Sequence, residues 1–153
     1  MFSKACEYGI RASILIASES VNGNRLGLIT IAKKIDSPEA FTSKILQKLV
    51  KEKIIFSIKG PGGGFEVNKN KLDKIKLVDI ILAIDGEVLK QCSLGLSDCS
   101  EVRPCPFHGR YKPIKEKLLK LYSETSLKDL IDGVLSGKSF LKIKAISKNL
   151  KNT

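Results

Sequence analysis

Residues 54–67 read IIFSIKGPGGGFEV, two short strand-like runs joined by a glycine-rich loop. Aliphatic and aromatic residues dominate 54–59, and the strand-like pattern returns at 65–67. Two such runs around a glycine loop predict a β-hairpin. Because no Lys-Ser or Lys-Thr pair follows the glycines, the loop does not match a nucleotide-binding phosphate loop.

The residues before the hairpin have helical periodicity. Apolar side chains at helical spacing predict an amphipathic helix over 3–19. Thr30 is expected to cap a short helix, and Ser37, with Pro38 at the first helical position, is expected to start a longer helix over 38–53. A helix, a short helix, a helix and a hairpin in this order predict a winged helix-turn-helix.

The residues after the hairpin predict three further helices and one irregular stretch. The pattern is helical over 72–84 and again from about Pro113. Ser126 and Asp129 have the spacing of a capping box, which predicts a last short helix. We therefore expect a fold that is mainly α with a small β-hairpin, in which a long helix follows the winged helix-turn-helix.

The helix over 38–53 is expected to contact nucleic acid. If Phe41, Ile45 and Leu49 point inward, helical geometry turns the opposite, polar face outward. Hydroxyls and glutamine can contact base edges, lysines contact phosphate, and a glycine loop can enter a narrow minor groove. An ordinary solvated face and a flexible turn are the alternatives. The candidate DNA-binding residues are Thr42, Ser43, Gln47, Lys48, Lys59, Gly60, Pro61, Gly62 and Gly63.

The charge of the chain agrees with such a partner. Lysine and arginine number 27 against 16 acidic residues, a formal net charge of +11, which favours a polyanion such as nucleic acid. No apolar run approaches the roughly 20 residues of a membrane helix. The first residues also lack the pattern of a secretion signal. We expect a folded cytoplasmic protein without a membrane partner.

Three of the four cysteines lie close to the single histidine. In a cytoplasmic chain, such cysteines bind metal or act in catalysis more often than they form disulfides. Cys92, Cys99, Cys105 and His108 supply the thiolates and imidazole that bind iron–sulfur clusters and zinc. Three reduced cysteines without a metal are the alternative. Cys6, outside this group, is expected to be a small buried helix residue.

Several motifs, in the right order, closely resemble the IscR/NsrR-type family of bacterial winged-helix transcription regulators. The resemblance covers roughly residues 2–135. It implies a homodimer on a near-palindromic double-stranded DNA operator, with the 38–53 helix in the major groove and the glycine loop in the minor groove. The matching segments are EYGIRA at 7–12, ILQKL at 45–49, SIKGPGGGF at 57–65 and LVDIILAIDG at 77–86.

The resemblance also implies how the chain is divided. The helix with Ile114, Leu118, Leu121 and Tyr122 fits the dimerisation helix of the family, although the same apolar stripe would suit packing against its own domain. The expected parts are a DNA-binding domain over 1–86, a cysteine-rich cluster-binding loop over 87–110, a dimerisation helix and short C-terminal helix over 111–137, and a basic flexible tail over 138–153.

In cluster-binding members of the family, three cysteines of this loop are ligands, which the resemblance assigns to Cys92, Cys99 and Cys105. The fourth ligand is in some members a histidine shortly after the third cysteine, here His108. In others it is an acidic residue near the start of the first helix, here Glu7, which can come from the partner chain. The first cysteine gap is one residue longer than in the best-known members. Two-iron and four-iron clusters therefore both stay open, with the two-iron form favoured.

The function implied is transcription regulation, as a repressor or an activator, with operator affinity controlled by an iron–sulfur cluster that senses redox state, iron or nitric oxide. A zinc-stabilised or cluster-free winged-helix regulator is the alternative. An enzyme would need Cys105 as nucleophile and His108 as base. No orienting acid or oxyanion loop is recognisable beside them, and we expect no catalytic activity.

Overall fold

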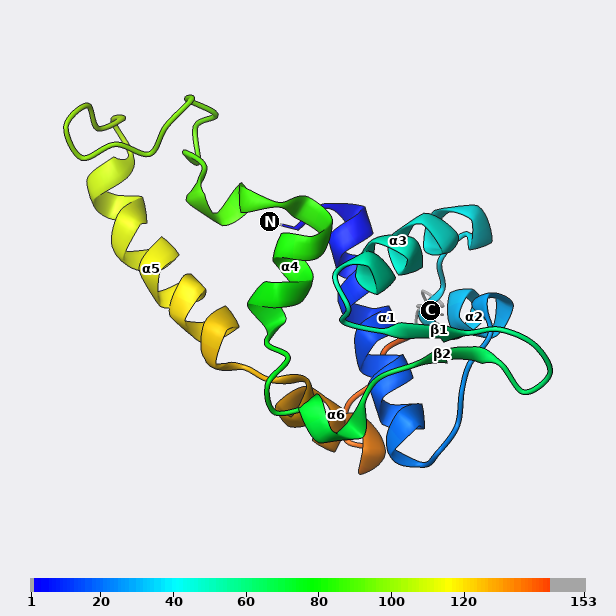
Figure 1. The fold of residues 1–153 in the computed structure, drawn as a ribbon. Helices are drawn as coiled ribbons and strands as arrows, with labels where there is room; N and C mark the ends of the chain where they lie inside the picture. The colour runs from blue at the N-terminus through cyan, green and yellow to red at the C-terminus, as the bar shows by residue number, and fades with distance from the viewer. Residues whose placement is uncertain (1, 144–153) are drawn as a thin grey trace, which may run out of the picture.

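Helix α1 (Lys4–Val21) is the central element of the computed structural model, which describes residues 2–143 (Figure 1). Ser3 caps this helix, and its hydroxyl oxygen accepts a 3.0 Å hydrogen bond from the backbone N–H of Cys6. Gly9 allows a close approach of α4, because a Cβ there would overlap Ile84 Cδ1. Helix α1 is therefore the element on which most of the others pack.

Helices α2 (Leu28–Ile35) and α3 (Glu39–Lys51) pack on α1 and on each other. Asp36 ends α2 in the left-handed conformation (φ 57°), which aspartate tolerates better than most residues. The core of the described chain, to which they contribute, is aliphatic, and its largest fully buried apolar side chains are Ile16, Ile31, Ile35, Leu46, Leu49, Ile55, Ile80, Ile81 and Leu127.

Strands β1 (Phe56–Ile58) and β2 (Gly64–Glu66) form an antiparallel hairpin. Ser57 is paired with Phe65, and Phe65 in turn exchanges backbone hydrogen bonds with Leu26, which precedes α2. The strand begins two residues later than predicted, because Ile54 and Ile55 turn into the core. The hairpin is thus fixed to the helix-turn-helix at its base, while its loop extends away (Figure 1).

The rest of the described chain passes along α1 and then leaves it. A short turn η1 (Lys69–Lys71) leads to α4 (Leu77–Asp85), and η2 (Glu87–Lys90) leads to an irregular stretch. Helix α5 (His108–Glu124) leads back towards the body of the protein, where α6 (Leu127–Leu135) packs on α1. The irregular stretch and the first half of α5 project from the body (Figure 1).

The predicted fold class is confirmed, with shifts at the helix ends. Thr30 lies inside α2, whose N-cap is Gly27, and Pro38 rather than Ser37 is the N-cap of α3. The helix predicted over 72–84 begins at Leu77. The capping box of Ser126 with Asp129 is present as predicted.

Helix α5 begins at His108, five residues before Pro113, where the sequence predicted its start. The first three residues of α5, at 108–110, carry no apolar side chain, so the apolar pattern begins only after the start of the helix. Of the predicted basic tail, Leu141 and Lys142 contact the body of the protein, and 144–153 fall outside the described residues. Within 2–143, no helix combines the length and the apolar character needed to cross a bilayer.

Candidate DNA interface and cysteine loop

The solvent-facing side of α3 carries three of the four residues predicted on it. Gln47 and Lys48 are exposed, and Ser43 is half-buried. Thr42 was expected on the same face, and this is wrong. Its side chain is fully buried, its hydroxyl donates a 2.8 Å hydrogen bond to the Pro38 carbonyl, and it lies 2.7 Å from the Ser37 hydroxyl. Thr42 therefore stabilises the first turn of α3 and cannot contact DNA from there.

Two neighbours change the expected face further. Phe41, expected inward, is 37% exposed and makes an edge-to-face contact with Tyr8 of α1, with ring centroids 5.8 Å apart. Lys44 is exposed next to Ser43 and was missed, because its charge alone did not distinguish it among many lysines. The Lys48 ammonium donates a 3.2 Å hydrogen bond to the Ile84 carbonyl, so in this conformation it lies over the end of α4.

The hairpin loop presents its predicted residues to solvent. Lys59, Gly60, Pro61 and Gly62 are exposed, and Gly63 is half-buried. Gly60 (φ 87°) and Gly62 (φ 72°) adopt the left-handed conformation that favours glycine. A side chain at Gly63 would overlap the Ile58 carbonyl. The backbone of this loop is thus exposed without side chains over it, so a ligand can approach it closely.

Arg25, which the sequence did not single out, fixes the base of this loop. Its Nε donates a 2.6 Å hydrogen bond to the Glu66 carboxylate, and its terminal nitrogen lies 3.4 Å from the Gly62 carbonyl oxygen. The guanidinium therefore connects the segment before α2 to the hairpin loop and to β2. The distance of 41 residues between Arg25 and Glu66 concealed the pair from sequence reasoning.

The cysteine loop brings its predicted ligands together as two pairs. Cys99 Sγ lies 3.6 Å from His108 Nδ1, at the first residue of α5. The pair borders a cleft of about 340 Å³ between the loop and α5, which also contains Asp98, Glu101, Lys112 and Lys115. The thiol beside the His108 imidazole is therefore that of Cys99, whereas Cys105, the partner that an enzymatic role would require, accepts a 3.0 Å hydrogen bond at its carbonyl oxygen from the His108 backbone N–H.

Cys92 and Cys105 form the second pair. Cys92, two residues after η2, is buried at 6% exposure, while Cys105 is half-buried. Hydrogen bonding from the backbone of Leu94, then from Leu96 and the Cys105 side chain, lowers the pKa of the Cys92 thiol. This environment favours the thiolate, which is the form that binds metals.

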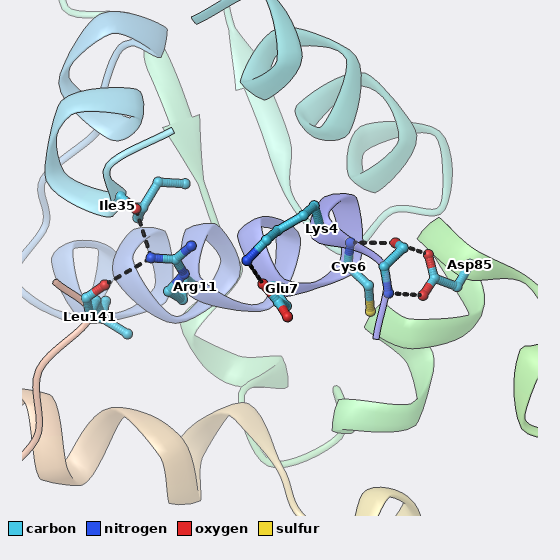
Figure 2. Close-up of polar contacts among 8 residues, drawn as sticks. Lys4, Cys6, Glu7, Arg11, Ile35, Asp85 and Leu141 are labelled. Atoms are coloured by element: carbon cyan, nitrogen blue, oxygen red, sulfur yellow. Dashed lines mark hydrogen bonds and ion pairs between the residues drawn. The ribbon is translucent and has the colours of Figure 1, made fainter. Parts of the chain in front are cut away.

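Glu7 is not gathered with the cysteines. It lies in the first turns of α1, where it forms a 2.8 Å ion pair with Lys4 (Figure 2), and the hydrogen bond from Lys4 lowers its pKa. Within residues 2–143, no three or more Cys, His, Asp or Glu side chains are grouped closely enough to hold a metal ion. The thiols and imidazole of the loop have the chemistry of a cluster site. The Cys99–His108 pair and the Cys92–Cys105 pair would have to approach each other to form such a site.

Helix α5 divides its apolar stripe between two directions. Tyr122 is buried against Phe2, with ring centroids 5.5 Å apart, and Leu118 packs on the core. Ile114 and Leu121 are each 55% exposed in the isolated chain. The stripe therefore serves the protein's own core on one side and leaves an uncovered apolar face on the other.

Comparisons with known proteins agree with this architecture. The family model of Rrf2, described as an iron-dependent transcriptional regulator, matches residues 2–133. A putative HTH-type transcriptional regulator of Aquifex aeolicus is 34% identical over 136 residues, covering 86% of this chain and 92% of that protein.

Two solved structures share the fold. CymR of B. subtilis, the global cysteine regulator, has a TM-score of 0.72 at 20% identity, covering 86% of this chain and 96% of that one. T. potens IscR has a TM-score of 0.69 at 16% identity, covering 91% of each chain. The family match spans the helix-turn-helix, the hairpin, the cysteine loop and α5. The chain belongs to the Rrf2 family of transcriptional regulators.

Proposed function

We propose that this regulator is a cytoplasmic homodimer that binds a near-palindromic operator, and that an iron–sulfur cluster held in the 92–108 loop controls its affinity for DNA. One observation carries the cluster proposal: the loop holds three thiols and one imidazole, and Cys99 and His108 are already within 3.6 Å of each other. The structural likeness to an IscR and the family description support it.

On this proposal Cys92, Cys99 and Cys105 hold the cluster, with His108 as the fourth ligand ahead of Glu7. His108 is on the same loop, whereas Glu7 is engaged by Lys4. When bound, the group supplies a redox-sensitive, nitric oxide-sensitive metal centre. The protein's part is to present a thiolate at Cys92 and to transmit the position of the loop to α5, which begins at His108.

DNA binding rests on the outward face of α3 and on the hairpin loop. Ser43, Lys44 and Gln47 are placed to contact a major groove, and Gly60 and Gly62 hold an open backbone for a narrow minor groove. The exposed face of α5, with Ile114 and Leu121, is assigned to the dimer contact. A tenfold change in operator affinity requires a difference of only about 1.4 kcal/mol between the two loop states.

The first test is an absorbance spectrum of protein purified without oxygen, with iron and sulfide quantified on the same sample. We expect broad absorbance at roughly 320–450 nm, typical of cysteine-bound clusters, lost in Cys92→Ala. Cys6→Ala is the matched control, because Cys6 is buried in α1 outside the loop. A colourless protein that contains zinc, or no metal after reconstitution, would defeat the cluster proposal.

The second test measures DNA binding directly. A duplex selected from a random library is titrated with holo and apo protein, and fluorescence anisotropy gives both affinities. We expect them to differ at least tenfold. Equal affinities would exclude control by the cluster, and failure of both forms to select any duplex would exclude the DNA-binding proposal.

A cluster-free thiol sensor is the second candidate, and the Cys92–Cys105 pair favours it. Hydrogen peroxide would oxidise the two thiols to a disulfide while its O–O bond breaks, and its two oxygens with the two thiol protons would leave as two water molecules. Mass spectrometry of peroxide-treated, metal-free protein should then show a loss of two hydrogens on a peptide pair that joins Cys92 to Cys105. Cys105→Ala should prevent this loss.

A further inference from the structure

The tip of the hairpin is a tight turn that has no polar side chain of its own. The Gly63 backbone N–H donates a 2.9 Å hydrogen bond to the Gly60 carbonyl, which closes a turn over residues 60–63. Pro61 at the second position and Gly62 at the third, with a φ of 72°, fit a type II turn. Because Gly-Pro-Gly-Gly carries no side-chain hydrogen-bond donor, such a donor has to come to the tip from another part of the chain.

Arg25 supplies that donor from outside the hairpin. It lies in the segment beside β2, where Leu26 exchanges backbone hydrogen bonds with Phe65. Its Nε donates a 2.6 Å hydrogen bond to the Glu66 carboxylate, and a terminal nitrogen lies 3.4 Å from the Gly62 carbonyl oxygen. The guanidinium therefore extends from β2 to the turn at the tip.

Most of the hydrogen-bonding capacity of this guanidinium remains for a ligand. An arginine side chain has five N–H donors in a planar fork, and the contacts that residues 2–143 make with Arg25 use two of them. The side chain is 40% exposed, so the other donors are open to a ligand. Because two contacts already hold the side chain in place, a third partner costs less conformational freedom than it would with a free arginine.

We propose that Arg25 contacts the DNA bases through the minor groove when the turn over 60–63 enters it. In that groove A·T pairs present only acceptors, whereas a G·C pair adds the amino group of guanine. A narrow A·T-rich groove also has a strong negative potential that attracts arginine. Arg25 therefore favours A·T pairs beneath the turn. This inference rests on the proposed DNA binding and adds to it a residue and a base preference.

Two alternative roles lead to different experimental results. If Arg25 only braces the turn, removal of its Glu66 partner should have the same effect on DNA binding as removal of the guanidinium. If any positive charge near the tip is sufficient, Lys59, which is exposed at the start of the loop, should have the effect assigned to Arg25. Variants of Arg25, Glu66 and Lys59 therefore separate the three roles.

The test uses the duplex selected from a random library, prepared once with adenine and once with 2,6-diaminopurine in place of every adenine. The replacement adds an amino group in the minor groove and keeps the major-groove donor and acceptor of adenine. Fluorescence anisotropy gives the affinity of the full-length wild-type chain and of Arg25→Ala, Glu66→Ala and Lys59→Ala for both duplexes. Circular dichroism melting first confirms that each variant is folded.

We expect wild type to bind the diaminopurine duplex at least roughly fivefold more weakly than the adenine duplex, the lower end of what one good base contact discriminates. Arg25→Ala should bind the two duplexes with nearly equal affinity. Glu66→Ala should keep the wild-type ratio, since the guanidinium remains beside Gly62. Lys59→Ala should weaken binding to both duplexes by the same factor, because a phosphate contact carries no base information.

Three results would overturn the inference. The same loss of the ratio in Arg25→Ala and Glu66→Ala would show that Arg25 only braces the turn. Loss of the ratio in Lys59→Ala, with the ratio kept in Arg25→Ala, would assign the contact to Lys59. Equal affinity of wild type for both duplexes would show that no side chain distinguishes the bases in the minor groove. If the wild-type chain selects no duplex at all, the proposed DNA binding fails first, so the two failures are distinguishable.

Discussion

Cys99 Sγ lies 3.6 Å from Nδ1 of His108, although the two residues are nine positions apart and lie on either side of a proline-bounded turn. The contact folds the irregular stretch back on the start of α5. Because His108 is the first residue of that helix, we expect a change in what Cys99 binds to move the start of the helix. This role of His108 is separable by experiment from the structural roles of nearby residues.

His108→Ala should reduce bound iron at least severalfold, because the variant removes the imidazole beside Cys99. Glu7→Ala should leave bound iron unchanged, since Glu7 is paired with Lys4 on α1, and an exposed ion pair of this kind contributes little to folding. Iron and sulfide analysis of the two anaerobic preparations decides between them. If Glu7→Ala loses iron and His108→Ala does not, the fourth ligand is Glu7 of α1 instead of His108.

Gly9→Ala should destabilise the protein by about 1–3 kcal/mol, the usual cost of overpacking a core. The added methyl group would overlap Ile84 Cδ1 and lie 3.2 Å from Ile45 Cγ2. Ile84→Val removes that Cδ1 and alone costs about 0.5–1.5 kcal/mol. Urea denaturation should therefore show that the double variant Gly9→Ala/Ile84→Val loses less free energy of unfolding than the two single variants lose together. If the losses of the two single variants simply add, α1 and α4 move apart to accept the methyl group and the predicted overlap with Ile84 does not arise.

Thr42→Val should cost about 1–2 kcal/mol of folding stability, because it removes the buried partner of the Ser37 hydroxyl and one of the two hydrogen bonds to the Pro38 carbonyl, which keeps the bond from the Thr42 backbone N–H. Its effect on DNA affinity should be small once the protein is folded. Ser43→Ala should do the reverse, with nearly unchanged melting and weaker binding to the selected duplex. A loss of sequence preference in folded Thr42→Val would contradict the burial of this side chain.

Burial and the nearby Asp85 raise the pKa of the Cys6 thiol to about 12. In the unfolded chain the ordinary value is about 8.5. A thiol whose pKa is raised on folding stabilises the native state fully below the ordinary value, and this contribution is lost as the pH rises towards 12. Cys6→Ala should therefore flatten the alkaline decline of folding stability between about pH 8.5 and 12, measured by urea denaturation.

Alkylation kinetics supply an independent check on the same thiol. In metal-free native protein at pH 8, Cys6 should react with iodoacetamide more slowly than the three loop cysteines, because the thiolate is the reactive form and Cys6 is fully buried. Peptide mass spectrometry follows each site. Rapid modification of Cys6 would show that the first turn of α1 opens frequently.

The sequence predicted elements whose pattern is local and strong. The hairpin, the capping box at Ser126 and the long first helix all have their signals within a few residues. Thr42 was misplaced because helical spacing alone cannot tell which of two adjacent positions faces the core. Here the hydroxyl of Thr42 finds two partners at the start of α3, so a polar side chain is buried at no loss of hydrogen bonding.

The sequence predicted which residues form the candidate site better than it predicted which of them are in contact. The spacing of Cys92, Cys99, Cys105 and His108 identified a group of donors, but which donors touch depends on a stretch without helix or strand. The start of α5 was missed for a related reason: His108 to Arg110 offer no apolar periodicity, and Pro113 has the appearance of a first-turn residue. Arg25 and Arg11 act across long sequence separations and leave no local signal.

The uncovered face of α5 has a consequence for how much of this protein a cell must contain. A helix of 17 residues gains little from its own propensity in water, and in the described residues α4 is the main element that supports α5. If Ile114 and Leu121 are covered by a second copy, the order of this helix follows mass action. Dilution would then loosen α5 and the cysteine loop at its start together, so that the abundance of the regulator, besides any signal, would set the fraction able to respond.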